Sequence, residues 1–157
     1  MPDYFQQRLT SETEKNYTFG ADGFVPDAVV IALGTNDFSH CRETPCTEAF
    51  LAGFVQAYVD FMVNVTRWYQ KHSIQFFCGV GPITVNYLNS TREAVSRAVA
   101  LGLKATFVDM QACARPYPGG TTQQGFCNGT ATHPGIVGHR RMFELSYRSI
   151  GERMGWL

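Results

Sequence analysis

The chain has 157 residues, of which 45% are hydrophobic, and its 13 basic and 13 acidic residues cancel. This length suffices for one domain with a hydrophobic core, so residues 1–157 are expected to form a single domain. The even charge, without blocks of one sign, argues against nucleic acid or an anionic membrane surface as a partner. The longest apolar runs, such as residues 28–33, are also too short to span a bilayer.

Three short apolar segments, each bounded by turn residues, predict buried strands. They are residues 28–33 (AVVIAL), 74–80 (IQFFCGV) and 105–110 (ATFVDM). A helix follows each of them in the sequence pattern. This alternation of strand and helix predicts an α/β domain with a parallel sheet and right-handed crossovers.

The first helix is predicted to begin at Thr44-Pro45, with proline at its first position, and to end near Lys71. Its apolar face comprises Phe50, Phe54, Tyr58, Phe61, Met62, Val65 and Tyr69. A second helix is predicted from the capping box at residues 90–93 to about Gly102.

A third helix is predicted after His133-Pro134. Its inward-facing residues are expected to be Met142, Phe143, Leu145, Tyr147, Ile150 and Met154. The preceding stretch, residues 112–132, is rich in glycine and proline and lacks periodicity. A loop of this length in a compact domain is usually functional.

The cysteines and asparagines point to an oxidising environment. Two close pairs lie in loop-like sequence, Cys41 with Cys46 and Cys113 with Cys127, and a Cys113–Cys127 disulfide is predicted to hold the long loop. Cys78 in its apolar run is predicted to be a buried free thiol. The spacings match no standard zinc pattern, so no metal is predicted. Four of the six asparagines head N-glycosylation triplets, where chance would give about one. These asparagines are Asn16, Asn64, Asn89 and Asn128. We therefore expect a secreted protein whose signal peptide is absent from this chain.

Polar residues at the ends of the predicted strands form the candidate site, because ligands of parallel α/β sheets bind beyond the carboxyl ends of the strands. Residues 34–37 (Gly-Thr-Asn-Asp) follow the first strand, residues 79–82 follow the second, and the long loop ends at His133. The Asn36 amide can donate a hydrogen bond to a developing oxyanion. A histidine held just before a helix-starting proline suits a general base.

Each of these features also has a plainer interpretation. The Gly-Thr-Asn-Asp segment could be a turn with a helix cap, and His133-Pro134 an ordinary turn. Asp109 is interpreted as a cap or a loop anchor and His139 as a residue of a helix surface, while no role is predicted for His40 or His72. The order and spacing of Asn36 and His133 on one strand-and-helix frame favour the functional interpretation.

This combination resembles the SGNH, or GDSL-type, hydrolases. Their strand followed by Gly-x-Asn-Asp is matched by residues 34–37, and their last block, centred on a catalytic histidine, by His133-Pro134. The chain is most similar to the catalytic domain of family-two carbohydrate esterases, the acetylxylan-esterase-like deacetylases. That similarity also includes residues 1–5, 26–39 and 151–156, and so spans nearly the whole chain.

The resemblance implies a three-layer αβα sandwich with a parallel, flavodoxin-like sheet and a carbohydrate O-acetyl esterase that uses a serine and a histidine. His133 would be the general base and Asn36 an oxyanion donor, and Gly34, Thr35 and Asp37 would contact the substrate. The implied partner is an acetylated polysaccharide or oligosaccharide, and no metal or organic cofactor is implied.

Two departures from the family pattern shape these expectations. The 33 residues before Gly34 contain no Gly-Asp-Ser nucleophile block, and Thr130 replaces the aspartate that usually precedes the histidine by three residues. We therefore expect the serine upstream of this chain, a fold incomplete at its N-terminus, and a 157-residue chain that is inactive alone. The alternatives are a degenerate, non-catalytic glycan-binding relative and an intact flavodoxin-like binding domain. For the binding domain, the loops lack a glycine-rich phosphate cradle, which argues against a nucleotide as its ligand.

Overall fold

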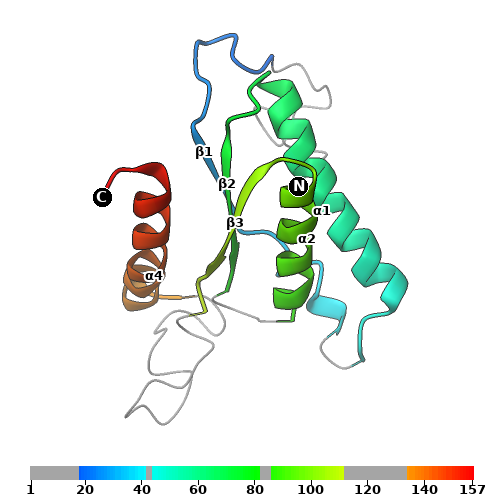
Figure 1. The fold of residues 1–157 in the computed structure, drawn as a ribbon. Helices are drawn as coiled ribbons and strands as arrows, with labels where there is room; N and C mark the ends of the chain where they lie inside the picture. The colour runs from blue at the N-terminus through cyan, green and yellow to red at the C-terminus, as the bar shows by residue number, and fades with distance from the viewer. Residues whose placement is uncertain (1–17, 42–43, 82–85, 112–133) are drawn as a thin grey trace.

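The protein has an α/β fold built on three parallel strands (Figure 1). The computed structural model describes residues 18–41, 44–81, 86–111 and 134–157. Strands β1 (Ala28–Ile31), β2 (Gln75–Val80) and β3 (Lys104–Asp109) lie in the order β1-β2-β3, with Ala28 beside Gln75 and Gln75 beside Lys104. All three strands lie within one residue of their predicted starts, and the parallel sheet confirms the predicted fold class.

Helices cover both faces of the sheet. Helices α1 (Glu48–Trp68) and α2 (Leu88–Ala100) pack on one face, and α4 (Ile136–Met154) packs on the other (Figure 1). A 3-10 turn, η2 (Ser39–Cys41), lies between β1 and α1. The carboxyl ends of the strands, η2 and the start of α2 gather at the lower edge of Figure 1, where the candidate site was predicted.

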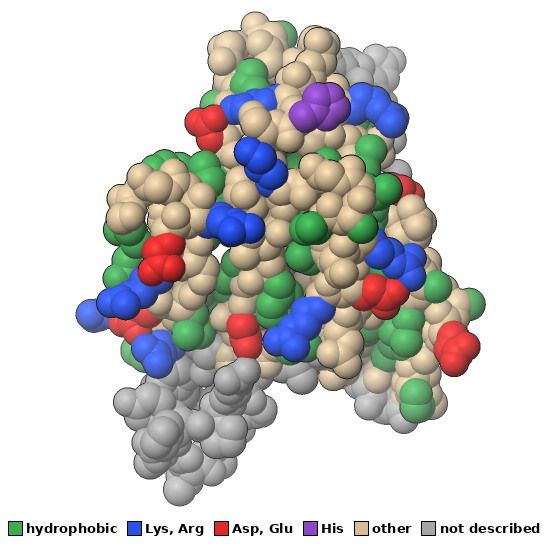
Figure 2. Space-filling view, in the orientation of Figure 1, with side chains coloured by type: hydrophobic (Ala, Val, Ile, Leu, Met, Phe, Trp, Pro, Cys, Tyr) green, Lys and Arg blue, Asp and Glu red, His purple; other side chains and the backbone are tan. Residues whose placement is uncertain are grey.

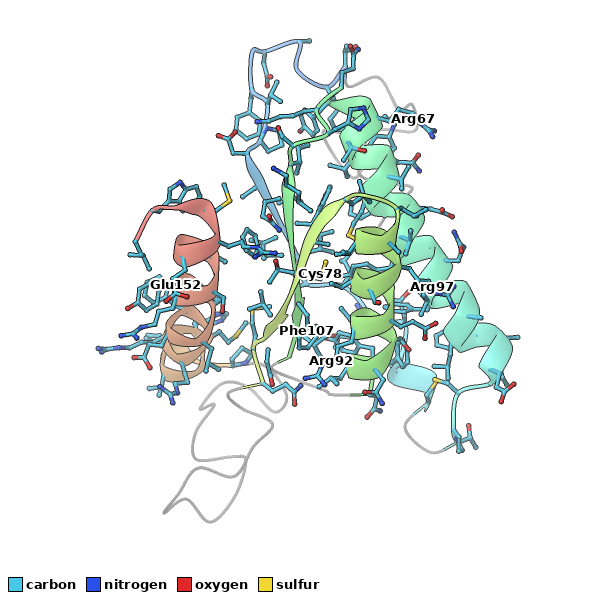
Figure 3. All side chains as sticks on the ribbon, viewed as in Figure 1. Arg67, Cys78, Arg92, Arg97, Phe107 and Glu152 are labelled. Carbon is cyan, nitrogen blue, oxygen red and sulfur yellow. A yellow bond between two sulfur atoms is a disulfide. The ribbon has the colours of Figure 1, made fainter. Side chains whose placement is uncertain are left out.

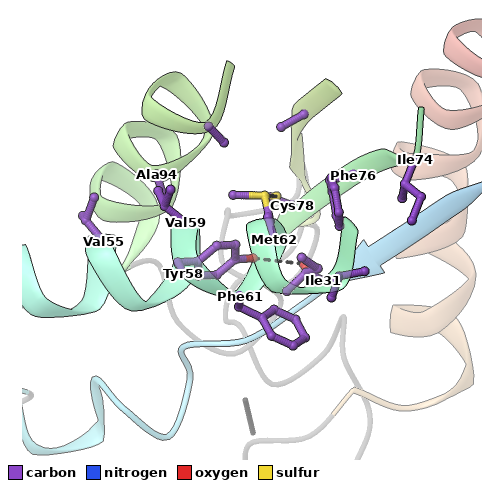
Figure 4. Close-up of a cluster of buried hydrophobic side chains, with 13 residues drawn as sticks. Ile31, Val55, Tyr58, Val59, Phe61, Met62, Ile74, Phe76, Cys78 and Ala94 are labelled. Carbon is purple, nitrogen blue, oxygen red and sulfur yellow. Dashed lines mark hydrogen bonds between the residues drawn. The ribbon is translucent and has the colours of Figure 1, made fainter. Parts of the chain in front are cut away.

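The main core lies between the sheet and helices α1 and α2 (Figure 4). Its fully buried members include Met62, Val65, Ile74, Phe76 and Cys78, each with 0% of its surface exposed. Alternation along β2 sends Phe77 to the opposite face, where it packs with Val108 and Met110 beneath α4. Every residue of β2 is buried, as its continuous apolar sequence predicts for a central parallel strand.

The structure corrects two predicted helix starts. Helix α1 begins at Glu48 rather than at Pro45, because the Thr47 side chain accepts a hydrogen bond from the Phe50 amide at 3.2 Å and caps the helix. Helix α2 begins at Leu88, so the predicted capping box lies inside the helix. There the Thr91 hydroxyl donates to the Tyr87 carbonyl at 3.0 Å.

Helix α1 is long and apolar enough to cross a membrane by length and composition, with a mean hydropathy of 1.3. The sequence expectation considered only continuous apolar runs and did not identify this helix. Its apolar residues have a nearer partner, since Val55, Tyr58, Val59, Phe61, Met62 and Val65 are all buried in the core of the domain. Core helices of globular domains pass the same length and composition test.

The face covered by α4 is less complete than the opposite face. Met142, Ile150 and Met154 pack toward the sheet as predicted, but Phe143 is 61% exposed and Leu145 is 37% exposed. Hydrophobic side chains alternate with acidic and basic ones on the side of the molecule that Figure 2 shows. Among the described residues β1 pairs only with β2, and Val30 on this edge strand is 56% exposed.

An exposed apolar edge strand is a site of self-association. We expect Val30→Lys to reduce self-association in sedimentation velocity without loss of folding, because this side chain is already largely solvated. Val29→Lys is the matched control. Val29 packs against the main core, so a lysine at this position should destabilise the fold. Unchanged association of Val30→Lys would exclude this edge as the contact.

Cys78 is a buried free thiol, as predicted, and its Sγ atom lies 3.8 Å from Sδ of Met62 in α1 (Figure 4). Burial raises the pKa of this thiol from 9.0 to about 12. The unfolded thiol therefore loses its proton above pH 9 while the folded thiol keeps it. Below pH 9 both states hold the proton, and this group adds no pH dependence.

The free energy of unfolding should fall between pH 9 and pH 10 by up to about 1.4 kcal/mol because of Cys78. Urea unfolding at several pH values measures this slope. Burial also raises the pKa of Tyr58, whose ordinary value is 10.0. Above pH 10 the unfolded tyrosine therefore loses its proton as well, and the slope no longer reports on Cys78 alone. A Cys78→Ala variant should show a shallower slope; an equal slope in both proteins would contradict the assignment.

Candidate active site

The turn after β1 presents the predicted Gly-Thr-Asn-Asp segment at the carboxyl edge of the sheet. The Phe38 amide donates to the Gly34 carbonyl at 3.0 Å, and the Ser39 hydroxyl donates to the Asn36 carbonyl at 2.7 Å. These bonds fix the backbone of Asn36, while the side chains of Asn36 and Asp37 are exposed. The turn thus fixes the backbone that carries the Asn36 amide and leaves the side chain accessible.

Phe38 anchors this turn to the domain. Its ring is 1% exposed and makes edge-on contacts with Phe50 and Phe54 of α1, at centroid distances of 5.1 and 4.9 Å. The Cys41–Cys46 disulfide joins η2 to the segment before α1, in agreement with one of the two predicted cysteine pairs. Aromatic packing of Phe38 on α1 therefore holds the turn in place, and the disulfide ties the segment that follows it to the start of α1.

Gly34 allows a close approach that no other residue would permit. Its φ angle is +125°, and an added Cβ atom would lie 2.7 Å from Cδ2 of Tyr87 and 3.1 Å from Cζ of Phe54. Tyr87 itself is 1% exposed and sits immediately before α2. The glycine at this position is thus required by both the backbone conformation and the aromatic ring beneath it.

The polar turn opens onto a hollow beside α1. Its volume is about 540 Å³, and its lining combines the turn with four residues of the helix. These four residues are Phe54, Ala57, Tyr58 and Phe61. Thr35, Asn36 and Asp37 contribute the polar side chains of the lining. A mostly apolar hollow with a few polar groups at one end is typical of a small-molecule site.

Of the other predicted site segments, the structure describes those that follow β2 and β3 at this edge of the sheet, and the end of the long loop lies outside the described residues. Gly81 follows β2, and its amide donates to the Tyr87 hydroxyl at 3.3 Å, close to the Gly34 turn. Asp109 ends β3 and accepts a hydrogen bond from the Gln111 amide at 3.0 Å, which confirms its interpretation as a loop anchor. His139 is exposed on α4, also as predicted.

His133, Thr130 and the Cys113–Cys127 pair lie outside the described residues. Helix α4 nevertheless starts at Ile136, close to the start that the His133-Pro134 pair predicted. The convergence of Asn36 and His133 on one cleft therefore stays a prediction.

Sequence reasoning missed two buried residues at this edge. Tyr87 contacts both the first and the second polar segment, and Gln111 lies beside Gly81 with 6% of its surface exposed. The Gln111 side-chain nitrogen is buried and has no hydrogen-bond partner among the residues that the structure describes. Neither residue belongs to a recognisable motif. Tyr87 could have been suspected only as an aromatic residue at the start of a helix.

The comparisons with known proteins identify the family. The model of the GDSL-like lipase/acylhydrolase family matches residues 2–146 of the chain. The chain belongs to this family. Cellulase/esterase CelE of Acetivibrio thermocellus is 34% identical over 139 residues, which cover 85% of this chain and 15% of CelE.

Two solved structures share the fold. A family two carbohydrate esterase from Clostridium thermocellum, in complex with cellohexaose, has a TM-score of 0.66 and 32% identity, and the match covers 87% of this chain and 38% of that one. An acetyl xylan esterase from the rumen bacterium Butyrivibrio proteoclasticus has a TM-score of 0.66 at 16% identity, with 87% and 39% coverage. These findings confirm the predicted family and fold, and the chain spans less than half the length of each of these relatives.

Gly34→Ala should destabilise this GDSL-family domain. A non-glycine residue at this φ angle costs about 1–3 kcal/mol, and the contact with the Tyr87 ring adds to that loss. Gly53→Ala is the matched control, because its Cβ would meet no atom within 4 Å and it lies inside α1, where alanine is favoured by about 0.5–1 kcal/mol. Thermal unfolding of both variants measures the difference. Equal midpoints for the two would contradict the role given to Gly34.

Proposed function

We propose that this chain forms part of a secreted carbohydrate O-acetyl esterase with a serine–histidine mechanism. The observation that carries the proposal is the placement of Asn36, whose backbone is fixed by the Ser39 hydroxyl and whose side chain lines the hollow beside α1. A side-chain amide carried by a fixed backbone at the end of a parallel strand is well placed to stabilise a developing negative charge.

In this mechanism a serine outside residues 1–157 attacks the acetyl carbonyl. His133 takes the serine proton and passes it to the leaving sugar oxygen, while Asn36 donates a hydrogen bond to the tetrahedral oxyanion. Water then releases acetate from the acetyl-enzyme, with His133 acting again as the base. Every proton moves between the serine, the histidine, the sugar oxygen and water, so the reaction needs no metal or organic cofactor.

The substrate class rests on the relatives. One similar structure was solved with cellohexaose and another is named an acetyl xylan esterase, which supports a β-linked, acetylated polysaccharide or oligosaccharide as the substrate. The half-buried ring of Phe54 lines the hollow and is suited to packing against the flat face of a sugar ring. Gly34, Thr35 and Asp37 complete the proposed contact surface.

Secretion is proposed on separate observations. The Cys41–Cys46 disulfide suits an oxidising compartment, and the exposed Asn89 heads one of the glycosylation triplets. Asn64 is half-buried, and its side chain accepts a hydrogen bond from Arg67 at 3.4 Å. Asn89 is therefore the better glycan acceptor of the two.

The second candidate function is a non-catalytic relative that binds glycans. Two features of the sequence favour it: Thr130 replaces the usual aspartate, and a glycan on Asn128 would crowd His133. Such a protein would use the same hollow and the same polar turn without turnover.

Hydrolysis of an aryl acetate distinguishes the two functions. We expect no turnover by the 157-residue chain above that of a His133→Ala control, because the chain lacks the Gly-Asp-Ser block. Co-expression with a segment that carries this block should produce turnover. Asn36→Ala should then lower it by about 10²–10³, the loss typical of one oxyanion donor.

Robust turnover by the chain alone, lost in His133→Ala, would show that it contains its own nucleophile. No turnover after co-expression, combined with binding of a xylo-oligosaccharide in a calorimetric titration, would support the non-catalytic alternative.

A further inference from the structure

The Tyr87 hydroxyl lies between the ends of two strands. It is 3.1 Å from Oγ1 of Thr35, in the turn after β1, and accepts a hydrogen bond from the Gly81 amide, after β2, at 3.3 Å. The residue is 1% exposed, and its ring packs on Phe38 at a centroid distance of 5.8 Å. One buried phenol thus connects two of the polar segments at the carboxyl edge of the sheet.

The chemistry of these three groups fixes the direction of the hydrogen bonds. A backbone N–H can only donate, so the Tyr87 oxygen accepts from Gly81. The phenol proton then needs an acceptor of its own. Among the described residues, Oγ1 of Thr35 is the one acceptor within hydrogen-bonding distance of this hydroxyl. The reverse direction, from Thr35 to Tyr87, would leave a buried phenol proton unpaired, which costs about 1–3 kcal/mol.

Tyr87 therefore donates to Thr35, and the Thr35 hydroxyl keeps its own proton for another acceptor. Thr35 is half-buried and lines the hollow next to Asn36. No further hydrogen bond of its side chain occurs with the part of the chain that the structure describes. A second donor is thus available beside the Asn36 amide.

We propose that Tyr87 is a positioning residue that orients the Thr35 hydroxyl as a hydrogen-bond donor to the ligand, beside the donor that Asn36 supplies. The ligand group is a neutral oxygen acceptor, the carbonyl of an acetyl ester or a hydroxyl of the sugar that carries it. This inference rests on the proposed function and deepens it, because it assigns one contact to Thr35 and a supporting role to a residue outside the family motif.

The alternative is that Tyr87 only fills space beneath Gly34. The ring alone would satisfy that role, since the close contacts of Gly34 are with ring carbons and not with the hydroxyl. Tyr87→Phe keeps the ring and removes the hydroxyl. It therefore separates the two explanations, and Thr35→Val and Thr35→Ser do the same on the other side of the bond.

The test measures the affinity of the 157-residue chain for an O-acetylated xylo-oligosaccharide by NMR titration. Thr35→Val should weaken binding by about twofold to tenfold, the change that one neutral hydrogen bond produces. Thr35→Ser should retain the affinity of the unmodified chain. Tyr87→Phe should weaken binding when Thr35 is present and have no further effect in the Thr35→Val background.

Tyr147→Phe on α4 is the matched control. It removes a phenol hydroxyl that accepts a hydrogen bond from Arg148 at 3.3 Å, on the other face of the sheet, and should leave affinity unchanged. Amide hydrogen exchange of Gly81 is measured on the same samples. It should become faster in Tyr87→Phe, because that amide loses its acceptor.

The outcomes separate this inference from the proposed function. If the unmodified chain binds and Thr35→Val binds equally well, or if the effects of Tyr87→Phe and Thr35→Val add, the inference is overturned and the proposed function stands. If the unmodified chain does not bind, the ligand contact assigned to Thr35 is overturned, while turnover after co-expression still decides the proposed function. A double-mutant cycle on unfolding then tests the Tyr87–Thr35 bond itself: coupling between the two substitutions supports this bond, and additivity overturns it.

Discussion

The pairing of β2 with a parallel strand on each side is the constraint on which the rest of this structure depends. All six residues of β2 are buried, so helices must cover both faces of the sheet. Parallel pairing also sends the chain back through a crossover after each strand, which brings every strand end to the same edge. The candidate site follows from this geometry, because the polar segments after β1 and β2 have no other place to lie.

Aromatic packing converts that general placement into a defined site. Phe38, Phe54 and Tyr87 form a cluster beneath the turn after β1, and Gly34 permits the turn to rest directly on the Tyr87 ring. Rigid rings lose little conformational entropy when they are buried, so the cluster can hold a polar turn in one conformation. The same tyrosine contacts the segment after β2 through its hydroxyl. The site is thereby fixed from below, and its exposed side chains remain available to a ligand.

The two faces of the sheet are covered unequally. Helices α1 and α2 cover two hydrophobic clusters, and the ring of Phe107 packs against the smaller one. The guanidinium of Arg92 lies over this ring, 4.8 Å from its centroid (Figure 3). On the other face, α4 is the one helix among the described residues, and Val30 and Phe143 are largely exposed. Strands with the continuous apolar character of β1 are usually interior in parallel sheets. The stability of this domain is therefore concentrated between the sheet and the α1–α2 layer.

The sequence by itself determined the strands and the polar turn, because each depends on a local pattern: an apolar run between turn residues, or Gly-Thr-Asn-Asp after such a run. The alternation of strands and helices also predicted that the strands are parallel. It misplaced the starts of α1 and α2, since Thr44-Pro45 and residues 90–93 have the composition of a cap, and only the packed chain shows that Thr47 makes the capping bond. The roles of Tyr87 and Gln111 were decided by tertiary structure alone. The hydrogen-bond partner of Tyr87 is distant in sequence, and the Gln111 side-chain nitrogen has no partner among the described residues. Burial makes these polar atoms depend on a hydrogen bond, and no local sequence pattern predicts burial at these positions.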